Sequence, residues 1–521
     1  LRRAAGSDPR RRDTAAQALD AAGAMAARLG DTRAAAYAAG YRAEVALDAG
    51  DLETAARYNQ RAVFAAQQAG SPETLFQWQW QAARVADRAG RTDDALAAYR
   101  RALDALARIK SDYAAELWAG RQSFRDEIGA AYFGLTDLLL RRAASGDAQA
   151  RREALREAQS VLERFKTVEL EDYFRDDCVA RYLARARPVE RTAPRTAVVY
   201  PVPLPDRLDL LVSIGDDIRL FSVPVGEERL RAETQALRRL LEKRTTFQYL
   251  SHARRLHDWL VRPIEPALAE ACVDTIVFVP EQPLRSVPLA ALHHGRDFLV
   301  SRYAVAIAPS LTLVEPRPLQ LDKASVLAGG LTEAVQGFPA LPFVDIELDE
   351  LRALGTKDVL RDRTFTANAF ARELTEKPYS VVHVASHAQF EADSRRSFLL
   401  TYDGRMTLDR LEDTLKVNRF RDEPVELLFL SACQTAAGDE RAALGLAGVA
   451  VKAGARSALA TLWHVNDQAS SVLVAEFYRQ LAKPGVSKAE ALRRAQREML
   501  GDLRYRHPGY WSPFLLIGNW L

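Results

Sequence analysis

Glycine turns recur at a fixed interval in the first part of the chain. The pairs Gly30-Asp31, Gly50-Asp51, Gly70-Ser71 and Gly90-Arg91 follow one another in steps of 20 residues. Glycine commonly ends a helix, and each interval leaves room for one helix of about four turns. Two helices per 40 residues predict a repeated helical hairpin, stacked in an array within residues 1–187.

The composition of this region supports an all-α array. It is rich in Ala and Arg, and Pro9 and Pro72 are its only prolines. Alanine and arginine are among the best helix formers, whereas proline interrupts helices. We expect helices to continue over residues 117–142 and 148–165, where the repeat itself fades.

One segment of the array resembles a tetratricopeptide repeat. Ala95, Tyr99 and Ala102 have the spacing of the small, aromatic and small positions in the second helix of that repeat, although the period here is 40 residues rather than about 34. Stacked helix pairs offer a concave groove, so we expect a protein or peptide partner, with Trp78, Trp80 and Tyr99 as candidate contributors. A wholly structural role for Tyr99 is the alternative. The alternative, in which the array only packs against the rest of the chain, stays open.

A proline-rich segment separates this array from the rest of the chain. Residues 188–205 contain five prolines, which favours a linker. A second domain is therefore predicted over residues 206–521, and its first part, up to about residue 272, is predicted to be a small sub-domain. Around the linker and in this sub-domain we expect strands at 196–200, 208–214 and 218–223, the last two forming a hairpin, and helices at 227–243 and 250–268.

Strands and helices alternate from Asp274 to the end of the chain. This alternation predicts an α/β domain with a mostly parallel sheet covered by helices on both faces. We expect strands at residues 275–280, 304–308, 324–327, 380–386, 425–432 and 457–462, and helices at 345–354, 367–375, 442–453, 468–481 and 488–500. The predicted fold class is a multidomain chain, an all-α repeat array followed by an α/β domain.

Two of these strands end in residues that can act together chemically. The apolar run Leu427–Leu430 leads to Cys433, and a β-branched run leads to His387, which is 46 residues earlier. Ligands of such sheets bind at the carboxyl ends of the strands. A neighbouring imidazole activates a cysteine by taking its proton, so the pair predicts covalent acyl transfer. Free cysteines are also common in protein cores, and a packing role for Cys433 is the alternative.

Net charge, cysteine content and apolar runs give no support for a nucleic-acid-binding, disulfide-rich, metal-binding or membrane-spanning protein. Lys and Arg total 72 against 69 Asp and Glu, and a net charge of +3 gives no indication of nucleic-acid or membrane binding. The cysteines are Cys178, Cys272 and Cys433, with no Cys-x-x-Cys pair, so we expect no disulfide framework, no metal and no cofactor, and a cytoplasmic protein. We expect Cys178 and Cys272 to be packing residues. No apolar run reaches the ~18 residues that a membrane span needs.

Several separated motifs together resemble the CHAT domain, a caspase-like family often found behind tetratricopeptide repeats. The similarity runs from about residue 200 to residue 521. It is carried by Leu430-Ser-Ala-Cys-Gln-Thr435, by residues 453–463 with Val465 and Asp467, by residues 507–514 and by the upstream segment 279–292. The resemblance implies a caspase-like fold for the second domain.

The same resemblance implies a cysteine endopeptidase related to caspases and separases. Cys433 would be the nucleophile, and His387 the general base and acid. Backbone N–H groups of Cys433 and Ala388 would stabilise the oxyanion. The family usually has glycine where this chain has Ala388, and an alanine would be strained there if the site requires a positive φ.

Further residues are candidates for substrate binding. Separases resemble the stretch around Asp467 and hold a basic side chain with an acid there, which implies that Asp467, helped by Asp439, accepts Arg or Lys. An N-cap of the following helix is the alternative role for Asp467. Ser431 and His464 are further candidates at this edge, whereas His383 is expected to be a hydrogen-bonded core residue.

The predicted function is cleavage of a specific protein target, controlled by a partner that binds the helical array. Relatives with this architecture act in bacterial defence and regulated cell death, so the resemblance implies such a setting. Two alternatives stay open. One is a catalytically silent scaffold, and the other is a thiol acyltransferase or hydrolase that uses the same dyad.

Overall fold

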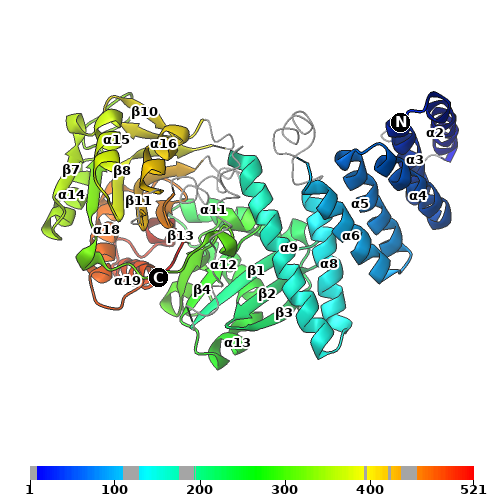
Figure 1. Cartoon of the computed structure of the whole chain (residues 1–521). Helices are drawn as coiled ribbons and strands as arrows, with labels where there is room; N and C mark the ends of the chain where they lie inside the picture. The colour runs from blue at the N-terminus through cyan, green and yellow to red at the C-terminus, as the bar shows by residue number, and fades with distance from the viewer. Residues whose placement is uncertain are drawn as a thin grey trace. The chain divides into compact units, whose positions relative to one another are not determined.

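The structure, a computed structural model, describes residues 9–109, 128–174, 193, 195–391, 396–419, 424–435 and 454–521. The chain divides into two compact units, Leu1–Phe165 and Lys166–Leu521. Figure 1 shows the helices and strands of each unit. Among the described helices, none combines the length and the hydropathy that crossing a bilayer requires.

The first unit is all-helical, as its sequence predicts. Each helix packs against the next from α2 to α6, and α6 packs against α8. The helix predicted at residues 117–142 is observed as α8 in the part that the structure describes. The helices are α2 (Pro9–Leu29), α3 (Thr32–Asp48), α4 (Leu52–Gln68), α5 (Pro72–Arg88), α6 (Thr92–Leu106), α8 (Ala130–Ser145) and α9 (Ala148–Phe174).

The turns between these helices have a backbone that glycine allows. The four predicted turn glycines all have φ between +59° and +79°: Gly30, Gly50, Gly70 and Gly90. Residues with a side chain rarely adopt this left-handed conformation. The next helix starts at once, and the Asp31 carboxylate caps α3 by accepting a hydrogen bond from the backbone N–H of Ala34 at 2.8 Å.

Large aromatic side chains fill the space between neighbouring helices. Trp78 of α5 is 1% exposed and lies over Gly40 of α3, where a Cβ atom would be 2.4 Å from its ring. Tyr99 of α6 is buried in the same way against Gly134 of α8. The expectation that Trp78 and Tyr99 line a binding groove is therefore wrong, because both rings are part of the core. Trp80 is partly exposed and stacks on Phe76 at a centroid distance of 6.1 Å.

The second unit is built on one sheet of thirteen strands within the described residues. The strand order is β10-β9-β8-β11-β12-β13-β5-β4-β1-β2-β3, and β6 pairs with both β7 and β8. The strands are β1 (Thr196–Pro203), β2 (Leu208–Ile214), β3 (Asp217–Val223), β4 (Thr275–Phe278), β5 (Ala304–Ile307), β6 (Val326–Gly330), β7 (Asp358–Arg361), β8 (Val381–Phe390), β9 (Phe398–Thr401), β10 (Gly404–Thr407), β11 (Leu427–Thr435), β12 (Ser457–Thr461) and β13 (Phe514–Gly518).

The predicted mostly parallel sheet is confirmed, and it contains one reversal in its middle. Strands β7, β6, β8, β11 and β12 are parallel to one another. Strands β13, β5, β4 and β1 form a second parallel group, and β12 pairs with β13 in the antiparallel sense. The carboxyl ends of the two groups therefore lie on opposite edges of the sheet.

The segment predicted as a linker is part of this sheet. Residues 196–203 form β1, which pairs with β4 on one side and β2 on the other. The pairing of β1 with β4 ends at Val199. Pro201 and Pro203 come two and four residues later, where β1 pairs only with β2 among the described strands. Proline lacks an N–H and is tolerated where a strand edge is unpaired. The division between the units falls after Phe165, inside α9, rather than at the prolines.

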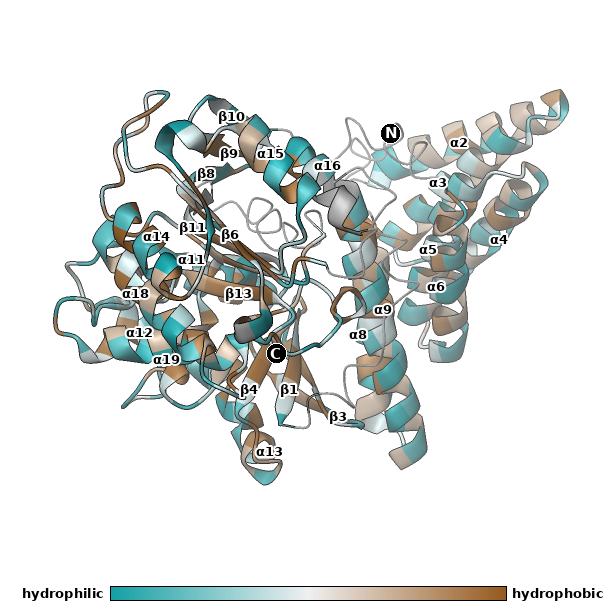
Figure 2. Cartoon of the chain, turned by 60° about the vertical axis from the view of Figure 1, so that its left-hand side comes forward, coloured by the Kyte–Doolittle hydropathy of each residue, from teal (hydrophilic) through white to brown (hydrophobic). Residues whose placement is uncertain are grey.

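Helices cover both faces of the sheet. Helices α14 and α18 contact each other, and they reach β6, β8 and β11 from one face. In Figure 2 the strands are largely hydrophobic, and α15 and α16 lie on the other side of β8 from α14 and α18. The helices of this unit are α11 (Glu227–Glu242), α12 (Tyr249–Leu260), α13 (Glu265–Glu270), α14 (Val344–Ala353), α15 (Ala367–Glu376), α16 (Leu408–Arg419), α18 (Asp467–Leu481), α19 (Lys488–Gly501) and α20 (Pro508–Trp511).

Candidate active site

Strands β8 and β11 bring His387 and Cys433 to the same edge of the sheet. In their parallel register Ala432 pairs with His387, and Cys433 pairs with Ala388. The backbones of His387 and Cys433 therefore lie on adjacent strands, one residue apart along the ladder. Both positions are toward the carboxyl ends of their strands, where open α/β sheets place their ligands.

An irregularity in the ladder comes directly before these residues. Leu430 pairs with Val384 and Ala432 pairs with His387, so β8 has one more residue than β11 over this step. A β-bulge of this kind turns the side chains that follow it and is frequent next to active sites. It changes the direction of His387 relative to His383, which strict alternation along the strand would place on the same face.

The imidazole of His387 is held by a backbone carbonyl. Its Nε2 atom lies 2.9 Å from the carbonyl oxygen of Pro339, and the ring of Phe338 lies 5.1 Å from the imidazole, centroid to centroid. A carbonyl oxygen only accepts hydrogen bonds, so this contact assigns the proton of a neutral ring to Nε2. Nδ1 is then the atom that can accept a proton.

A tight turn presents this carbonyl to His387. Phe338 donates its N–H to the carbonyl oxygen of Val335 at 2.9 Å, and the two residues between them, Gln336 and Gly337, have φ of +53° and +80°. Positive φ at both central positions is the pattern of a type I′ turn. The turn fixes the backbone on which Phe338 and Pro339 approach the imidazole.

Ala388 has an ordinary backbone. Within the described residues, the residues other than glycine that have a positive φ are Cys272, Gln336 and Asp362. The strain that a positive φ would place on Ala388 is therefore absent. Cys272 is exposed, so the expectation that it is a packing residue is wrong. Cys178 lies outside the described residues.

A buried polar network lies beneath this edge. The Ser431 hydroxyl donates to Glu347 Oε1 at 2.9 Å, and Glu347 Oε2 lies 3.3 Å from His383 Nε2. His383 Nδ1 lies 3.2 Å from the hydroxyl of Tyr478. All four side chains are at most 2% exposed. The prediction that His383 is a hydrogen-bonded core residue is confirmed, and the hydroxyl of Ser431 points to the interior rather than to a substrate.

Asp467 is not the N-cap residue of α18. The N-cap of α18 is Asn466, whose side chain accepts a hydrogen bond from the N–H of Ala469 at 3.1 Å. Asp467 Oδ2 instead accepts from the backbone N–H of Phe343 at 2.7 Å. Burial, together with the nearby Glu347, raises the pKa of Asp467 to about 6. The N-cap interpretation of Asp467 is therefore wrong.

Neither Asp467 nor Glu347 forms an ion pair with a lysine or an arginine in the part of the chain that the structure describes. Glu347 contacts His383 and Ser431, and Asp467 contacts a backbone N–H. The carboxylates come close enough for Glu347 to raise the pKa of Asp467. The acidic groups on α14 and α18 thus lie near each other, and neither pairs with a lysine or arginine among the described residues.

A family model for the CHAT domain matches residues 250–519. The chain belongs to the CHAT domain family. A search of curated proteins found no match for this CHAT-domain chain.

Solved structures with a similar fold cover most of the CHAT-domain chain at low sequence identity. Two structures of the Saccharomyces cerevisiae separase–securin complex match 94% of it, with 8% and 9% identity and TM-scores of 0.43 and 0.45. The chain spans about half of each matched chain, 50% and 45%. A complex of the Porphyromonas gingivalis RgpB pro- and mature domains matches 56% of this chain and 76% of its own, with 10% identity and a TM-score of 0.33.

The segment that follows β12 in the CHAT domain is fixed by two arginines. Arg238 of α11 is 4% exposed and donates to the carbonyl oxygens of Ser286 and Leu462, both at 2.8 Å. Its guanidinium also lies 4.7 Å from the ring centroid of Trp463. Arg244 donates to the carbonyl oxygen of His464 at 3.0 Å. The backbone that leads to Asp467 is therefore held by one arginine of α11 and by one that follows this helix.

His464 lies at the same edge as His387. Its side chain is exposed, and partial removal from water together with the nearby His387 and Arg244 lowers its pKa. Asp439 lies outside the described residues. Among the residues that the structure describes, no group of three or more His, Cys, Asp or Glu is placed to hold a metal ion.

Several contacts of the site come from residues that the sequence did not single out, namely Pro339, Phe343, Arg238 and Glu347. Only Glu347 had a local signal. It falls with Val344, Leu348 and Leu351 on the buried stripe of α14, at the spacing of one helix face. A carboxylate on an apolar stripe has to find a polar partner in the interior.

Proposed function

We propose that this CHAT-domain protein is a cysteine endopeptidase with Cys433 as nucleophile and His387 as general base and acid. The observation that carries the proposal is the register of β8 and β11, which places the two backbones side by side, with His387 Nε2 committed to Pro339. Nδ1 is then free to take the thiol proton, since a thiolate rather than a thiol attacks a carbonyl.

The proposed reaction runs in two steps. The Cys433 thiolate forms a bond to the carbonyl carbon of the peptide, and the C–N bond breaks as the imidazolium returns its proton to the leaving amine. Water then attacks the thioester, His387 takes the proton of the water, and the products are a carboxylic acid and the regenerated thiol. The backbone N–H groups of Cys433 and Ala388 are proposed to hold the oxyanion, and the ordinary backbone of Ala388 supports this role.

We further propose that the site prefers a substrate with Arg or Lys before the cleaved bond. Asp467 and Glu347 provide negative charge without a lysine or arginine partner among the described residues. A guanidinium or ammonium of the substrate would supply the missing cation, and a charge-assisted pair out of water discriminates strongly against apolar side chains. Asp439 and His464 are proposed as further contacts of this subsite, and Ser431 is left out because its hydroxyl is bound to Glu347.

The helical unit is proposed to bind a protein or peptide that controls the peptidase, in bacterial defence or regulated cell death. Its stacked helix pairs support a partner-binding role. Deleting residues 1–110 is the direct test: the truncated protein should still react with an active-site probe but should no longer respond to its partner. Unchanged regulation would contradict the partner-binding part of the proposal.

Covalent labelling tests the dyad. The purified protein would be treated with peptide acyloxymethyl ketones that carry Arg or Leu before the warhead, and the labelled cysteine identified by mass spectrometry. We expect labelling at Cys433, loss of that label in Cys433→Ala and a rate about 100-fold lower in His387→Ala. Cys272→Ala is the matched control, because Cys272 is an exposed cysteine outside the site.

Each outcome of the labelling has a distinct meaning. A label that stays in Cys433→Ala and disappears in Cys272→Ala would contradict the dyad. No labelling of any variant, with or without cell lysate as a source of the partner, would favour a scaffold. Labelling without cleavage of any peptide, but with transfer of its acyl group to an added amine, would favour an acyltransferase.

A further inference from the structure

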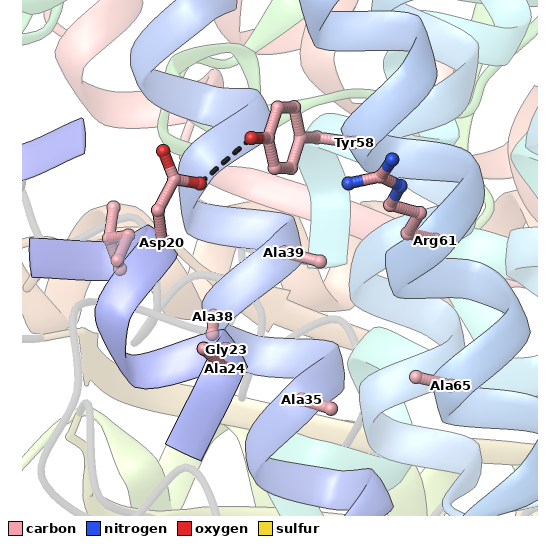
Figure 3. A pocket seen from close by; sticks show the side chains of 10 residues that line it. Asp20, Gly23, Ala24, Ala35, Ala38, Ala39, Tyr58, Arg61 and Ala65 are labelled. Atoms are coloured by element: carbon pink, nitrogen blue, oxygen red, sulfur yellow. Dashed lines mark hydrogen bonds between the residues drawn. The ribbon is translucent and has the colours of Figure 1, made fainter. Parts of the chain in front are cut away.

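A pocket opens between α2, α3 and α4 of the helical unit. It has a volume of about 240 Å³, and its walls come from α2, α3 and α4. Figure 3 shows that these walls are made mainly of residues without a long side chain. They are Gly23 and Ala24 of α2, Ala35, Ala38 and Ala39 of α3, and Ala65 of α4.

The alanine-rich walls explain why the pocket is unfilled. Alanine side chains end at Cβ, so the helices can approach one another closely while their surfaces leave unfilled space between them. Helices α3 and α4 are held together by core residues such as Ala36 and Ala62, which are fully buried with Trp78. Glycine and alanine form most of its walls, and Asp20, Tyr58 and Arg61 also line the pocket. Its size suits one side chain better than a larger ligand, since small-molecule sites usually start at about 300 Å³.

One side of the pocket carries a polar rim. The hydroxyl of Tyr58 donates to Asp20 Oδ1 at 2.8 Å, a bond that Figure 3 shows running from α4 to α2. Arg42 Nε lies 3.5 Å from Asp20 Oδ2. The guanidiniums of Arg42, Arg57 and Arg61 lie 4.9, 5.7 and 5.2 Å from the centroid of the Tyr58 ring.

This rim has an excess of positive charge. Asp20 pairs with Arg42, and Asp51 is near enough to Arg57 and Arg42 for their charges to help lower its pKa, so three arginines stand against two carboxylates. Arg57 and Arg61 are exposed, and neither forms an ion pair with a carboxylate in the described part of the chain. The side chain of Arg57 donates only to the hydroxyl of Thr54, at 3.4 Å. Two guanidiniums beside an apolar pocket match a ligand that has an apolar group next to an anionic one.

Apolar surface also continues outside the pocket. Phe64 is 61% exposed and stands between the pocket residues Arg61 and Ala65 in α4. Met25 is 48% exposed and follows the pocket residue Ala24 in α2. Large exposed apolar side chains beside a pocket are typical of an interaction surface.

We propose that this pocket is the recognition site for an acidic peptide, whose one aliphatic or aromatic side chain enters the alanine-lined pocket while its Asp or Glu side chains pair with Arg57 and Arg61. This proposal rests on the partner-binding role proposed above for the helical unit. It adds that the partner is an acidic peptide with one aliphatic or aromatic side chain. It is independent of the dyad, because its residues all belong to the helical unit. A nucleic acid fits less well, since the ring of Tyr58 is surrounded by guanidiniums rather than open for stacking.

Fluorescence anisotropy of the full chain carrying Cys433→Ala tests the site, with labelled peptides of equal length as probes. The set combines a central Leu, Phe or Gly with flanking Glu, Gln or Lys, and a labelled single-stranded DNA of similar charge is included. We expect the Glu-flanked peptides with Leu or Phe to bind tightest. Exchange of Glu for Gln and exchange of Leu for Gly should each weaken binding about tenfold.

Two variants separate the charge from the pocket. Arg57→Glu with Arg61→Glu should abolish the preference for Glu over Lys flanks. Ala39→Leu should fill the pocket and remove the preference for Leu over Gly while the preference for Glu stays. Arg152→Glu with Arg156→Glu is the control, because it makes the same charge change at the same i,i+4 spacing on exposed α9 surface outside the pocket.

The proposal is overturned if Lys-flanked peptides or the DNA bind as tightly as the acidic peptides, or if the central residue has no effect. It is equally overturned if the charge-reversed variant binds the acidic peptides as the parent does. Circular dichroism melting of each variant shows whether the unit still folds. The labelling rate at Cys433, measured in the same substitutions on the parent chain, should not change, so a failure here and a failure of the dyad are distinguishable.

Discussion

Asp467 accepts a hydrogen bond from the backbone N–H of Phe343 at 2.7 Å, although the two residues are 124 positions apart. Phe343 precedes the first turn of α14, and Asp467 is the first residue of α18. The bond therefore ties together the starts of the two helices that contact β6, β8 and β11 from one face. It also fixes one oxygen of the carboxylate.

The preference for a basic substrate should depend on pH through Asp467. Burial raises the pKa of this carboxyl to about 6, so it is ionised above that pH and neutral below it. The ratio of labelling rates for the Arg and Leu probes should fall about tenfold per pH unit below about pH 6, because the ratio cancels the titration of the dyad itself. Asp467→Asn should give a low ratio at every pH. A ratio that stays high in this variant would remove Asp467 from the subsite.

The same substitution should change stability in a pH-dependent way. The pKa of Asp467 is raised from 3.8 in the unfolded chain to about 6 in the fold, so the folded state binds more protons between these values and loses stability as pH rises through them. Asp467→Asn removes this loss. We expect a higher Tm than the parent at about pH 7 and no gain near pH 4, measured by scanning calorimetry. A gain of equal size at both pH values would show that the carboxylate charge is not its cause.

Arg238 should be a positioning residue for the segment that carries Asp467. Its guanidinium satisfies the carbonyl oxygens of Ser286 and Leu462 inside the protein. Arg238→Met should lower the free energy of unfolding by ~2–4 kcal/mol, because two buried acceptors lose their donor. It should also lower the selectivity for the Arg probe more than the rate with the Leu probe. Arg239→Met is the control, since Arg239 is the exposed neighbour in α11, and an equal effect of both would contradict the prediction.

Gly40 and Gly23 form a matched pair in the helical unit. A Cβ at Gly40 would lie 2.4 Å from the Trp78 ring, whereas a Cβ at Gly23 would meet Ala38 at an ordinary 3.7 Å. Gly40→Ala should destabilise the unit by ~1–3 kcal/mol through overpacking. Gly23→Ala should stabilise it by ~0.5–1 kcal/mol, because alanine is the better helix former. Hydrogen exchange of the α3 and α5 peptides in the full chain measures both effects, and equal protection in the two variants would contradict this packing.

Ala388→Gly should bring no gain in activity. Ala388 has no positive φ to relieve, and its side chain is 5% exposed within β8. The glycine should leave the labelling rate of Cys433 within about twofold and lower stability by ~0.5–1 kcal/mol, because glycine loses more conformational freedom on folding. A large rise in the labelling rate would show that the site needs a backbone that alanine resists.

The parts of the site that the sequence predicted are those that depend on local pattern. The apolar runs before His387 and Cys433 identify two buried strands, and parallel strands share one carboxyl edge, so a shared edge followed from the pattern alone. The helices at 227–242 and 488–501 were likewise predicted to within about two residues, because their apolar spacing and ends are visible in the sequence.

The parts that could not be predicted depend on contacts between distant segments. The carbonyl of Pro339 meets His387 across 48 residues, and the carbonyl of Leu462 meets Arg238 across 224. No local pattern encodes such a contact. Strands β7, β9, β10 and β13 were also missed, because the first three have four residues each and β13 begins where the aromatic motif at 507–514 ends.

Two predictions failed because the same residue type serves two purposes. Prolines mark linkers, but they also fit a strand edge that has lost its neighbour, as in the second half of β1. Tryptophan and tyrosine mark binding grooves, but they also fill the space above a helix glycine, as Trp78 does above Gly40. Only the position of the neighbouring element separates the two purposes.

The left-handed glycines at 30, 50, 70 and 90 make the junctions of the helical unit interchangeable. Every junction reverses the chain with the same backbone, so excising residues 31–70 would join Gly30 to Ser71 in the arrangement that Gly70 and Ser71 have now. Duplication or loss of a 40-residue pair in a gene would thus lengthen or shorten the array without the invention of a new turn. Descendants of one ancestral sequence could in this way acquire helical arrays of different length, while the sheet edge that carries His387 and Cys433 is inherited unchanged.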